Sequence, residues 1–285
     1  MREPRGGVEQ KAGNPKGLDA DAISTGLGTR IVGRRVVVLH EVDSTNTEAM
    51  HLADGGASEG TVILAESQRA GRGRLGRSWE SAPGLGLWTS VLLRPRVDPH
   101  LVPLISLLGA VSACEAINGS GYPIGCRLKW PNDLMLGGRK VGGVLGEARF
   151  VGDHLRYIVL GIGLNVHHRP EHFSAKVREG ATSLELTTGR RWNRTALARA
   201  LYRRLDDWYL CYTTSAHLEL LDRARSLCIT IGSRLTVRSE TEVCSAWGET
   251  IEADGALRVR LDDGRVRRIT AGETGLSEWP GNPEE

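Results

Sequence analysis

The chain has 285 residues, of which 40% are hydrophobic and 25% charged, and its formal net charge is +3. This composition is typical of a globular protein with room for one large and one small domain, and so small a net charge does not by itself indicate nucleic-acid binding. No stretch approaches the roughly 18 apolar residues of a membrane span, and the N-terminus lacks the apolar segment of a secretory signal, so a cytoplasmic location is expected.

Apolar periodicity and turn residues predict alternating helices and strands from Leu18 onward, whereas residues 1–17 are rich in Gly, Pro and charge and are expected to be a disordered tail. Asp43-Ser44 and Asn193 stand where helix caps are expected, and Gly137-Gly138 suits a two-residue hairpin turn. The predicted helices span 18–27, 45–53, 101–117, 193–212 and 216–226. The predicted strands span 35–42, 61–66, 85–93, 127–130, 133–136, 139–150 and 154–166.

The pattern changes after Cys228. Short strand-like segments separated by Gly and Asp turns follow at 234–237, 242–252, 257–261 and 266–270. This spacing predicts a small β-barrel attached to a larger α+β domain. We therefore expect a mixed β-sheet with packed helices over 18–228, the barrel over 229–277 and a tail over 278–285.

The segment Gly71–Gly76, with the sequence GRGRLG, satisfies the G-x-G-x-x-G pattern of dinucleotide-binding loops. Such a loop must open a helix, whereas this one runs into Arg77-Ser78-Trp79, a poor helix start. Glycines let a backbone approach phosphates, and guanidinium groups bind phosphate or carboxylate oxygens. The sequence predicts a lid without fixed structure that an anion orders, or alternatively a solvated basic loop. Three arginines within six residues favour the lid.

A second group of polar residues is Lys129-Trp-Pro-Asn-Asp133, followed by Lys140 beyond the glycine turn. A partly buried lysine needs an anionic partner, and the glycines beside Lys140 permit close approach of a ligand. The alternative places Lys140 on the solvent face of the hairpin. Likewise, Asp133 can bind a ligand or simply stabilise a turn.

Together these residues resemble the biotin–protein ligases. That family's landmarks are Ser-Thr-Asn, Gln-x-x-Gly-Arg-Gly-Arg, Lys-Trp-Pro-Asn-Asp, Arg-Lys-x-x-Gly and Gly-x-Gly-x-Asn. They occur here, in this order, as Ser44-Thr45-Asn46, Gln68 with Gly71–Arg74, Lys129–Asp133, Arg139-Lys140 with Gly143, and Gly161–Asn165. The resemblance implies a class II synthetase-like catalytic domain with a mixed sheet of about seven strands, plus a C-terminal barrel resembling SH3 domains.

It also implies an activity in two steps. Biotin reacts with ATP and Mg²⁺ to give biotinyl-5′-AMP and pyrophosphate, and a carrier-protein lysine then displaces AMP. The expected carrier is the biotin carboxyl carrier domain of a biotin-dependent carboxylase. The expected enzyme is a monomer or weak homodimer, and an exposed sheet edge could serve dimerisation or docking of the carrier. Only about 33 mostly irregular residues precede the first strand, too few for the N-terminal winged helix of repressor members, so no DNA binding is expected.

The resemblance assigns roles to individual residues. Lys140 is expected to bind the biotin carboxylate and the bridging oxygen, and Arg72 and Arg74 the phosphate region. Asp133 is expected to bind metal or to orient the acceptor lysine. The remaining ligand-binding set comprises Ser44, Thr45, Asn46, Gln68, Gly71, Gly73, Trp79, Lys129, Asn132, Gly143 and Asn165. Within it the first four suit the polar groups of biotin, while Trp79 and also Trp88 pack on apolar ligand parts or in the core.

Three alternatives stay open at this point. Lipoate–protein ligases and octanoyltransferases resemble biotin ligases in fold, although the Gly-Arg-Gly-Arg and Lys-Trp-Pro-Asn-Asp segments favour biotin. A biotin sensor without catalysis would be expected to lack the arginines and Lys140, which are present here. Nucleic-acid binding through the basic loop lacks a recognition fold and nearby stacking aromatics.

Overall fold

The computed structural model describes residues 17–122, 124–214, 216–238, 243–270 and 273–276. Apart from Gly17, the predicted N-terminal tail lies outside these residues, and so does the predicted tail 278–285. Within the part that is described, no helix has both the length and the apolar character needed to cross a membrane.

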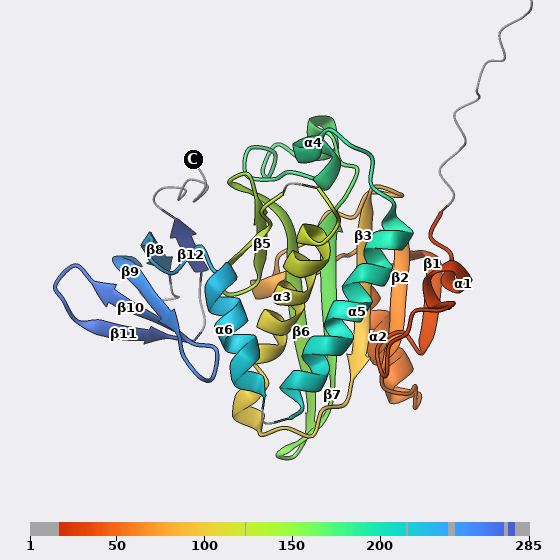
Figure 1. The fold of residues 1–285 in the computed structure, drawn as a ribbon, viewed down its shortest axis with the longest axis horizontal. Coiled ribbons are helices and arrows are strands. Elements are labelled where there is room, and N and C mark those ends of the chain that lie inside the picture. Colours follow the sequence, from red (N-terminus) through yellow and green to blue (C-terminus); the bar gives the residue numbers. More distant parts are fainter. Residues whose placement is uncertain (1–16, 123, 215, 239–242, 271–272, 277–285) are drawn as a thin grey trace, which may run out of the picture.

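The larger unit is built on a seven-stranded mixed sheet, as expected (Figure 1). The strand order is β1-β2-β3-β7-β6-β5-β4; β1 and β2 run parallel, and all other neighbours run antiparallel. Every residue of β3 is buried, because helices cover both faces of the sheet there. The strands are β1 (Arg35–Val42), β2 (Thr61–Gln68), β3 (Gly86–Leu93), β4 (Arg127–Lys129), β5 (Asp133–Leu136), β6 (Arg139–Val151) and β7 (His154–Asn165).

Helices pack on the two faces unequally. α3, α5 and α6 contact one another on one face, where α3 also contacts β6, and α2 lies against β2, β3 and β7 on the other face (Figure 1). Twelve of the fifteen residues of α3 are buried, which explains its almost wholly apolar sequence. The helices are α1 (Ala20–Ser24), α2 (Thr45–Asp54), α3 (Leu104–Asn118), α4 (Leu184–Thr188), α5 (Arg194–Tyr212) and α6 (His217–Leu227).

Local turn and cap chemistry was predicted with mixed success. Gly137 and Gly138 have φ of 54° and 76°, the left-handed pair that a two-residue hairpin turn requires, and Asn193 caps α5 by accepting from the backbone of Ala196. The prediction for Ser44 was wrong in part, because this residue occupies the N-cap position of α2 without a side-chain capping bond. The short helix α4 was not predicted.

The C-terminal unit is a five-stranded antiparallel sheet in the order β11-β10-β9-β8-β12. Four strands were expected, and the fifth, β12, was missed. Along β10 the apolar residues Leu257, Val259 and Leu261 are buried while Arg258 and Arg260 face solvent, the alternation of a sheet with one covered face. The strands are β8 (Arg234–Arg238), β9 (Val243–Ile251), β10 (Leu257–Leu261), β11 (Val266–Ile269) and β12 (Glu273–Leu276).

Trp130 joins the two units. Its backbone N–H donates to Thr230 Oγ1 at 3.0 Å, its indole Nε1 donates to the Gly255 carbonyl at 2.9 Å, and its own carbonyl accepts from Thr274 Oγ1 at 2.9 Å. All three partners belong to the C-terminal part of the chain, and the Trp130 side chain is 2% exposed. Only Pro131 separates Trp130 from Asn132 and Asp133, so this anchor also fixes the position of those two residues.

The carboxylate of Asp206, on α5, holds the segment between α1 and β1. It accepts three backbone N–H bonds at 2.7–2.8 Å, from Arg30, Ile31 and Val32, and is 4% exposed. Replacing Asp206 by alanine should lower the free energy of unfolding by about 3 kcal/mol, because three backbone donors lose a charged, buried acceptor. Urea denaturation checks this. A loss below about 1 kcal/mol would show that water or a neighbour replaces the carboxylate.

Candidate active site

The glycine–arginine loop, residues 71–81, has a defined backbone instead of the unstructured lid that was expected. It forms a small hairpin in which the Gly73 N–H donates to the Arg77 carbonyl at 2.7 Å and the Trp79 N–H to the Gly71 carbonyl at 2.8 Å. At its tip Leu75 has a φ of 55°, an unfavourable conformation for a branched residue, and is 65% exposed. The loop opens no α-helix, which agrees with rejection of the dinucleotide-binding interpretation.

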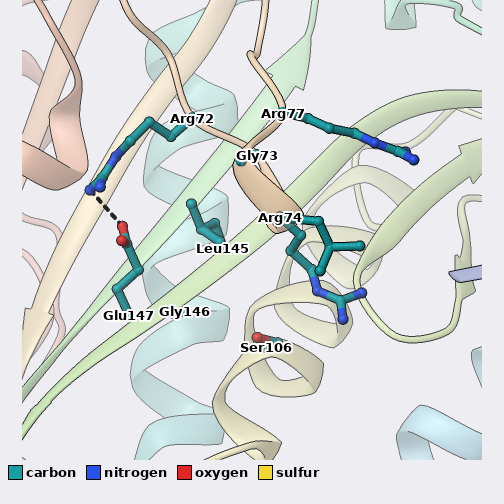
Figure 2. A pocket seen from close by; sticks show the side chains of 10 residues that line it. Arg72, Gly73, Arg74, Arg77, Ser106, Leu145, Gly146 and Glu147 are labelled. Carbon is teal, nitrogen blue, oxygen red and sulfur yellow. Dashed lines mark hydrogen bonds and ion pairs between the residues drawn. The ribbon is translucent and has the colours of Figure 1, made fainter. Parts of the chain in front are cut away.

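Beneath the loop lies a cavity of about 420 Å³ (Figure 2). Its lining consists of the loop residues 72–77, Ser106 at the start of α3, and Leu145, Gly146 and Glu147 of β6. Figure 2 shows the side chain of Arg72 extending toward Glu147 while that of Arg77 extends in the opposite direction. The cavity therefore combines three guanidinium groups with one carboxylate, a lining suited to an anionic ligand.

Two of the arginines contact residues outside the loop, one on β6 and one in the turn between β4 and β5. Arg72 Nη2 lies 2.7 Å from Glu147 Oε2, and Arg74 Nη1 donates to Asn132 Oδ1 at 3.3 Å. Asn132 is itself fixed, because its Nδ2 donates to the Val144 carbonyl at 2.6 Å. The structure thus brings the arginine motif and the Lys-Trp-Pro-Asn-Asp motif together, although Gly71 and Lys129 are 58 positions apart in the sequence.

Polar residues at the start of α2 are hydrogen-bonded to Gln68 at the end of β2. Gln68 Oε1 accepts from the backbone N–H of Thr45 at 2.9 Å, and Gln68 Nε2 donates to Ser81 Oγ at 2.7 Å. Ser90 Oγ on β3 lies 2.8 Å from Thr45 Oγ1 and donates to Asn46 Oδ1 at 2.5 Å. Thr45 and Asn46 are each 4% exposed. Buried polar groups of this kind are retained where they are hydrogen-bonded, so this set forms a pre-organised polar wall.

Lys140 lies at the start of β6 beside Asp133. Its Nζ is 2.5 Å from Asp133 Oδ1 and 5.3 Å from the centre of a Trp79 ring, and its side chain is 36% exposed. The ammonium sits between a carboxylate and an aromatic face, an arrangement that favours a ligand site over the solvent-face alternative. The backbone of Lys140 is fixed as well, because its N–H donates to the Gly180 carbonyl and its carbonyl accepts from Thr182.

Glycines of β6 and β7 form the surface under Trp79. A Cβ on Gly163 would come within 2.9 Å of the Trp79 ring and one on Gly143 within 3.2 Å, while one on Gly161 would come within 2.2 Å of Asn46 Oδ1. Gly143 and Gly163 are direct partners in the β6–β7 ladder. These positions therefore require glycine for close approach of an overlying group.

His168 lies in a buried aromatic cluster next to this surface. Its ring stacks on Phe173 with centres 5.1 Å apart, meets Trp88 edge-on at 5.7 Å, and is 2% exposed. Burial, with His172 and His167 nearby, lowers the pKa of His168 from 6.5 to about 4. The ring is therefore neutral at physiological pH.

This pKa predicts a loss of stability in acid. The folded-state pKa of His168 lies below its unfolded value, so its contribution to stability is complete above about pH 6.5 and is lost as the pH falls toward 4. We expect His168→Phe, which keeps the stack on Phe173, to lose less stability than the parent between pH 7 and 4.5 in urea titrations. Identical pH profiles would contradict this.

Most of the predicted site residues lie together, but not all of them make side-chain contacts within the site. Trp79 links the two halves of the site, because its ring contacts Gly143 and Gly163 and its carbonyl accepts from Ser81. Asn165 donates to the Thr182 carbonyl at 3.0 Å, and Trp88 is a core residue, 1% exposed. Lys129 faces Asp133 across the β4–β5 ladder, and none of the side-chain contacts described for the site involves its ammonium.

Three residues of the site were not predicted, namely Glu147, Ser90 and Ser81. Glu147 stands in an otherwise apolar strand, VGGVLGEA, on the same face as Gly143 because side chains alternate along a strand. That periodicity was the available signal. Ser81 and Ser90 carry no comparable signal, because their partners are distant in sequence.

Among the described residues, no three His, Cys, Asp or Glu side chains gather as a metal site. Mg²⁺ that arrives with a nucleotide needs only one or two protein carboxylates, since phosphate oxygens and water complete its shell. Asp133 fits that requirement as a single carboxylate, although in this structure its Oδ1 contacts Lys140. Metal binding by Asp133 remains a prediction.

Known proteins are similar to this chain in fold and in sequence. Residues 38–165 match the Biotin/lipoate A/B protein ligase family. The chain is 30% identical over 262 residues to the bifunctional ligase/repressor BirA of Bacillus subtilis, covering 92% of this chain and 80% of that one. It is 31% identical over 232 residues to the biotin–[acetyl-CoA-carboxylase] ligase of Paracoccus denitrificans, covering 80% of this chain and 95% of that one. The structure of the Aquifex aeolicus biotin protein ligase in complex with biotin and ATP aligns with a TM-score of 0.72 at 29% identity, covering 85% of this chain and 98% of that one. The chain belongs to the Biotin/lipoate A/B protein ligase family, among its biotin–protein ligases.

Proposed function

We propose that this protein activates biotin with ATP as biotinyl-5′-AMP and transfers the biotinyl group to a lysine of a carrier protein. The observation that carries the proposal is the position of Lys140: its ammonium lies beside Asp133 and Trp79, at the edge of a glycine surface and near the arginine loop. A cation beside a flat apolar surface suits a ligand with an apolar body and a terminal carboxylate.

In the first step a carboxylate oxygen of biotin attacks the α-phosphorus of ATP, an O–P bond forms, and pyrophosphate leaves. Two anions repel each other, so the rate depends on cations that stabilise charge on the phosphoryl oxygens. Lys140 would bind the carboxylate and the bridging oxygen, and Arg72 and Arg74 the phosphate. Mg²⁺ bound to ATP would supply further positive charge when present.

In the second step a neutral lysine amine of the carrier attacks the carbonyl carbon of the mixed anhydride. The C–O bond breaks, AMP leaves with the electron pair, and the amine loses its proton. We assign Asp133 to orient that amine, and its contact with the ammonium of Lys140 supports this role. Closure of the arginine loop over the anhydride would keep water away from it.

The polar wall of Ser44, Thr45, Asn46 and Gln68 is proposed to bind the polar ring of biotin. Thr45 and Gln68 present both donors and acceptors, as a ureido group requires. The glycine surface with Trp79 would accept its apolar part. Lipoate carries no ureido group, so this wall favours biotin over the lipoate alternative.

Pyrophosphate exchange into ATP tests this assignment. We expect exchange that depends on biotin and not on lipoate or octanoate. Exchange that depends on lipoate instead would support the alternative activity, and biotin binding without exchange would indicate a sensor.

The finer assignments remain proposals. Among the described residues, β6 pairs with β5 only up to Gly143 yet continues beside β7 to Val151, which leaves an open strand edge next to the arginine loop. We propose this edge for docking of a biotin carboxyl carrier domain, with the enzyme a monomer or weak homodimer. We also keep the division into 18–228 and 229–277, and a cytoplasmic location, where ATP is available and the free thiols of the five cysteines stay reduced.

A further inference from the structure

The cavity under the arginine loop contains one acidic side chain, Glu147. Of the ten lining residues three are arginines, and the Glu147 side chain is 25% exposed. A partly buried carboxylate among guanidinium groups is stabilised by pairing, and it competes for them with any anion that enters.

Two donors converge on one oxygen of Glu147. Asn46 Nδ2 and Arg72 Nη2 each lie 2.7 Å from Oε2. The orientation of the Asn46 amide follows from its other end, because Oδ1 accepts from Ser90 and the amide nitrogen must then face Glu147. The buried amide thus fixes the carboxylate, and the carboxylate fixes Arg72.

These bonds belong to one network that runs between the two ends of the loop. The network begins at Arg72, near the start of the loop. It finishes at Ser81 and the Trp79 carbonyl, near the end of the loop. Between them lie the residues assigned to biotin. In order the network passes through Arg72, Glu147, Asn46, Ser90, Thr45, Gln68, Ser81 and Trp79.

We propose that Glu147 is a positioning residue that holds Arg72, and with it the loop, while no ligand is bound, and that the anionic ligand takes Arg72 from it. The proposal rests on the proposed function, which assigns Arg72 to phosphate or carboxylate. Carboxylate and phosphate offer a guanidinium similar acceptors, so one replaces the other without a new kind of contact. Glu147 thereby links ordering of the loop to ligand binding.

Glu147→Gln keeps the shape and acceptor but removes the charge. Without ligand, trypsin should cleave this variant after Arg72, Arg74 or Arg77 about fivefold faster than the parent, because cleavage of a transiently open segment follows its open population. The KM for Mg·ATP in pyrophosphate exchange should fall about fivefold, since the competing carboxylate is neutralised, with a smaller change in kcat. Glu147→Asp, which keeps the charge but shortens the side chain, should show smaller changes in the same directions.

Glu41→Gln is the matched control. Glu41 pairs with Arg69 just before the loop, and both side chains are well exposed. In Glu41→Gln, therefore, neither the rate of tryptic cleavage nor the KM for Mg·ATP should change. Unchanged cleavage of Glu147→Gln, or a KM that rises while kcat falls, would overturn the proposal. The cleavage comparison needs no substrate, so its result does not depend on the proposed function. The proposed function fails separately, if the parent protein shows no biotin-dependent exchange.

Discussion

Replacing Lys140 by alanine should reduce the rate of biotin-dependent pyrophosphate exchange by about 100- to 1,000-fold, the usual effect of removing one positioned charge-stabilising donor. The ammonium is the cation nearest to Asp133 and the Trp79 ring in the described contacts, so its loss removes the proposed carboxylate partner. Most of the loss should appear in kcat. Single-turnover formation of the adenylate measures it.

Stability should change little, because the Lys140–Asp133 pair is partly exposed and such pairs contribute about 1 kcal/mol or less. Lys176→Ala, at an exposed lysine, is the control and should retain parental activity. Full activity of Lys140→Ala would show that Lys140 has no role in the mechanism. A large drop in unfolding midpoint would mean that the lost activity reflects folding.

Replacing Trp130 by alanine should lower the free energy of unfolding by about 4 kcal/mol. The side chain is 2% exposed, and its removal leaves a large cavity and frees the Gly255 carbonyl from its indole donor. Because only Pro131 separates Trp130 from Asn132 and Asp133, the protein that still folds should also lose activity. Guanidinium chloride denaturation and pyrophosphate exchange measure the two effects.

Trp130→Phe separates packing from the hydrogen bond, since it keeps an aromatic ring without the indole N–H. We expect it to lose about 1–2 kcal/mol. Trp247 on β9 is 46% exposed, so Trp247→Ala should cost less than about 1 kcal/mol. Equal losses at Trp130 and Trp247 would show that Trp130 does not anchor the C-terminal sheet.

The sequence predicted the elements whose signals are local. β1 and β10 begin and end where their apolar patterns do, and the Gly137-Gly138 turn has the backbone that this pair of residues favours. The strand β12 was missed because its four residues carry no alternation and owe their conformation to pairing with β8.

The sequence predicted the motifs of the site but not the contacts between them. The order of the motifs identified Lys140, Asp133 and the arginines, but the arginine loop was expected to lack structure because its charges repel. The structure offsets that repulsion with acceptors from distant segments, Glu147 of β6 for Arg72 and Asn132 of the β4–β5 turn for Arg74. Contacts between residues 58 or 75 positions apart leave no periodic signal in the chain.

The most direct test is transfer of biotin to a carrier. The protein is incubated with biotin, Mg·ATP and a biotin carboxyl carrier domain, and the carrier is weighed by mass spectrometry. We predict one biotinyl group on a single lysine, formed only when biotin and ATP are both present, and none on a carrier whose acceptor lysine is replaced by arginine. A carrier that stays unmodified, or that accepts lipoate or octanoate instead of biotin, would contradict the account.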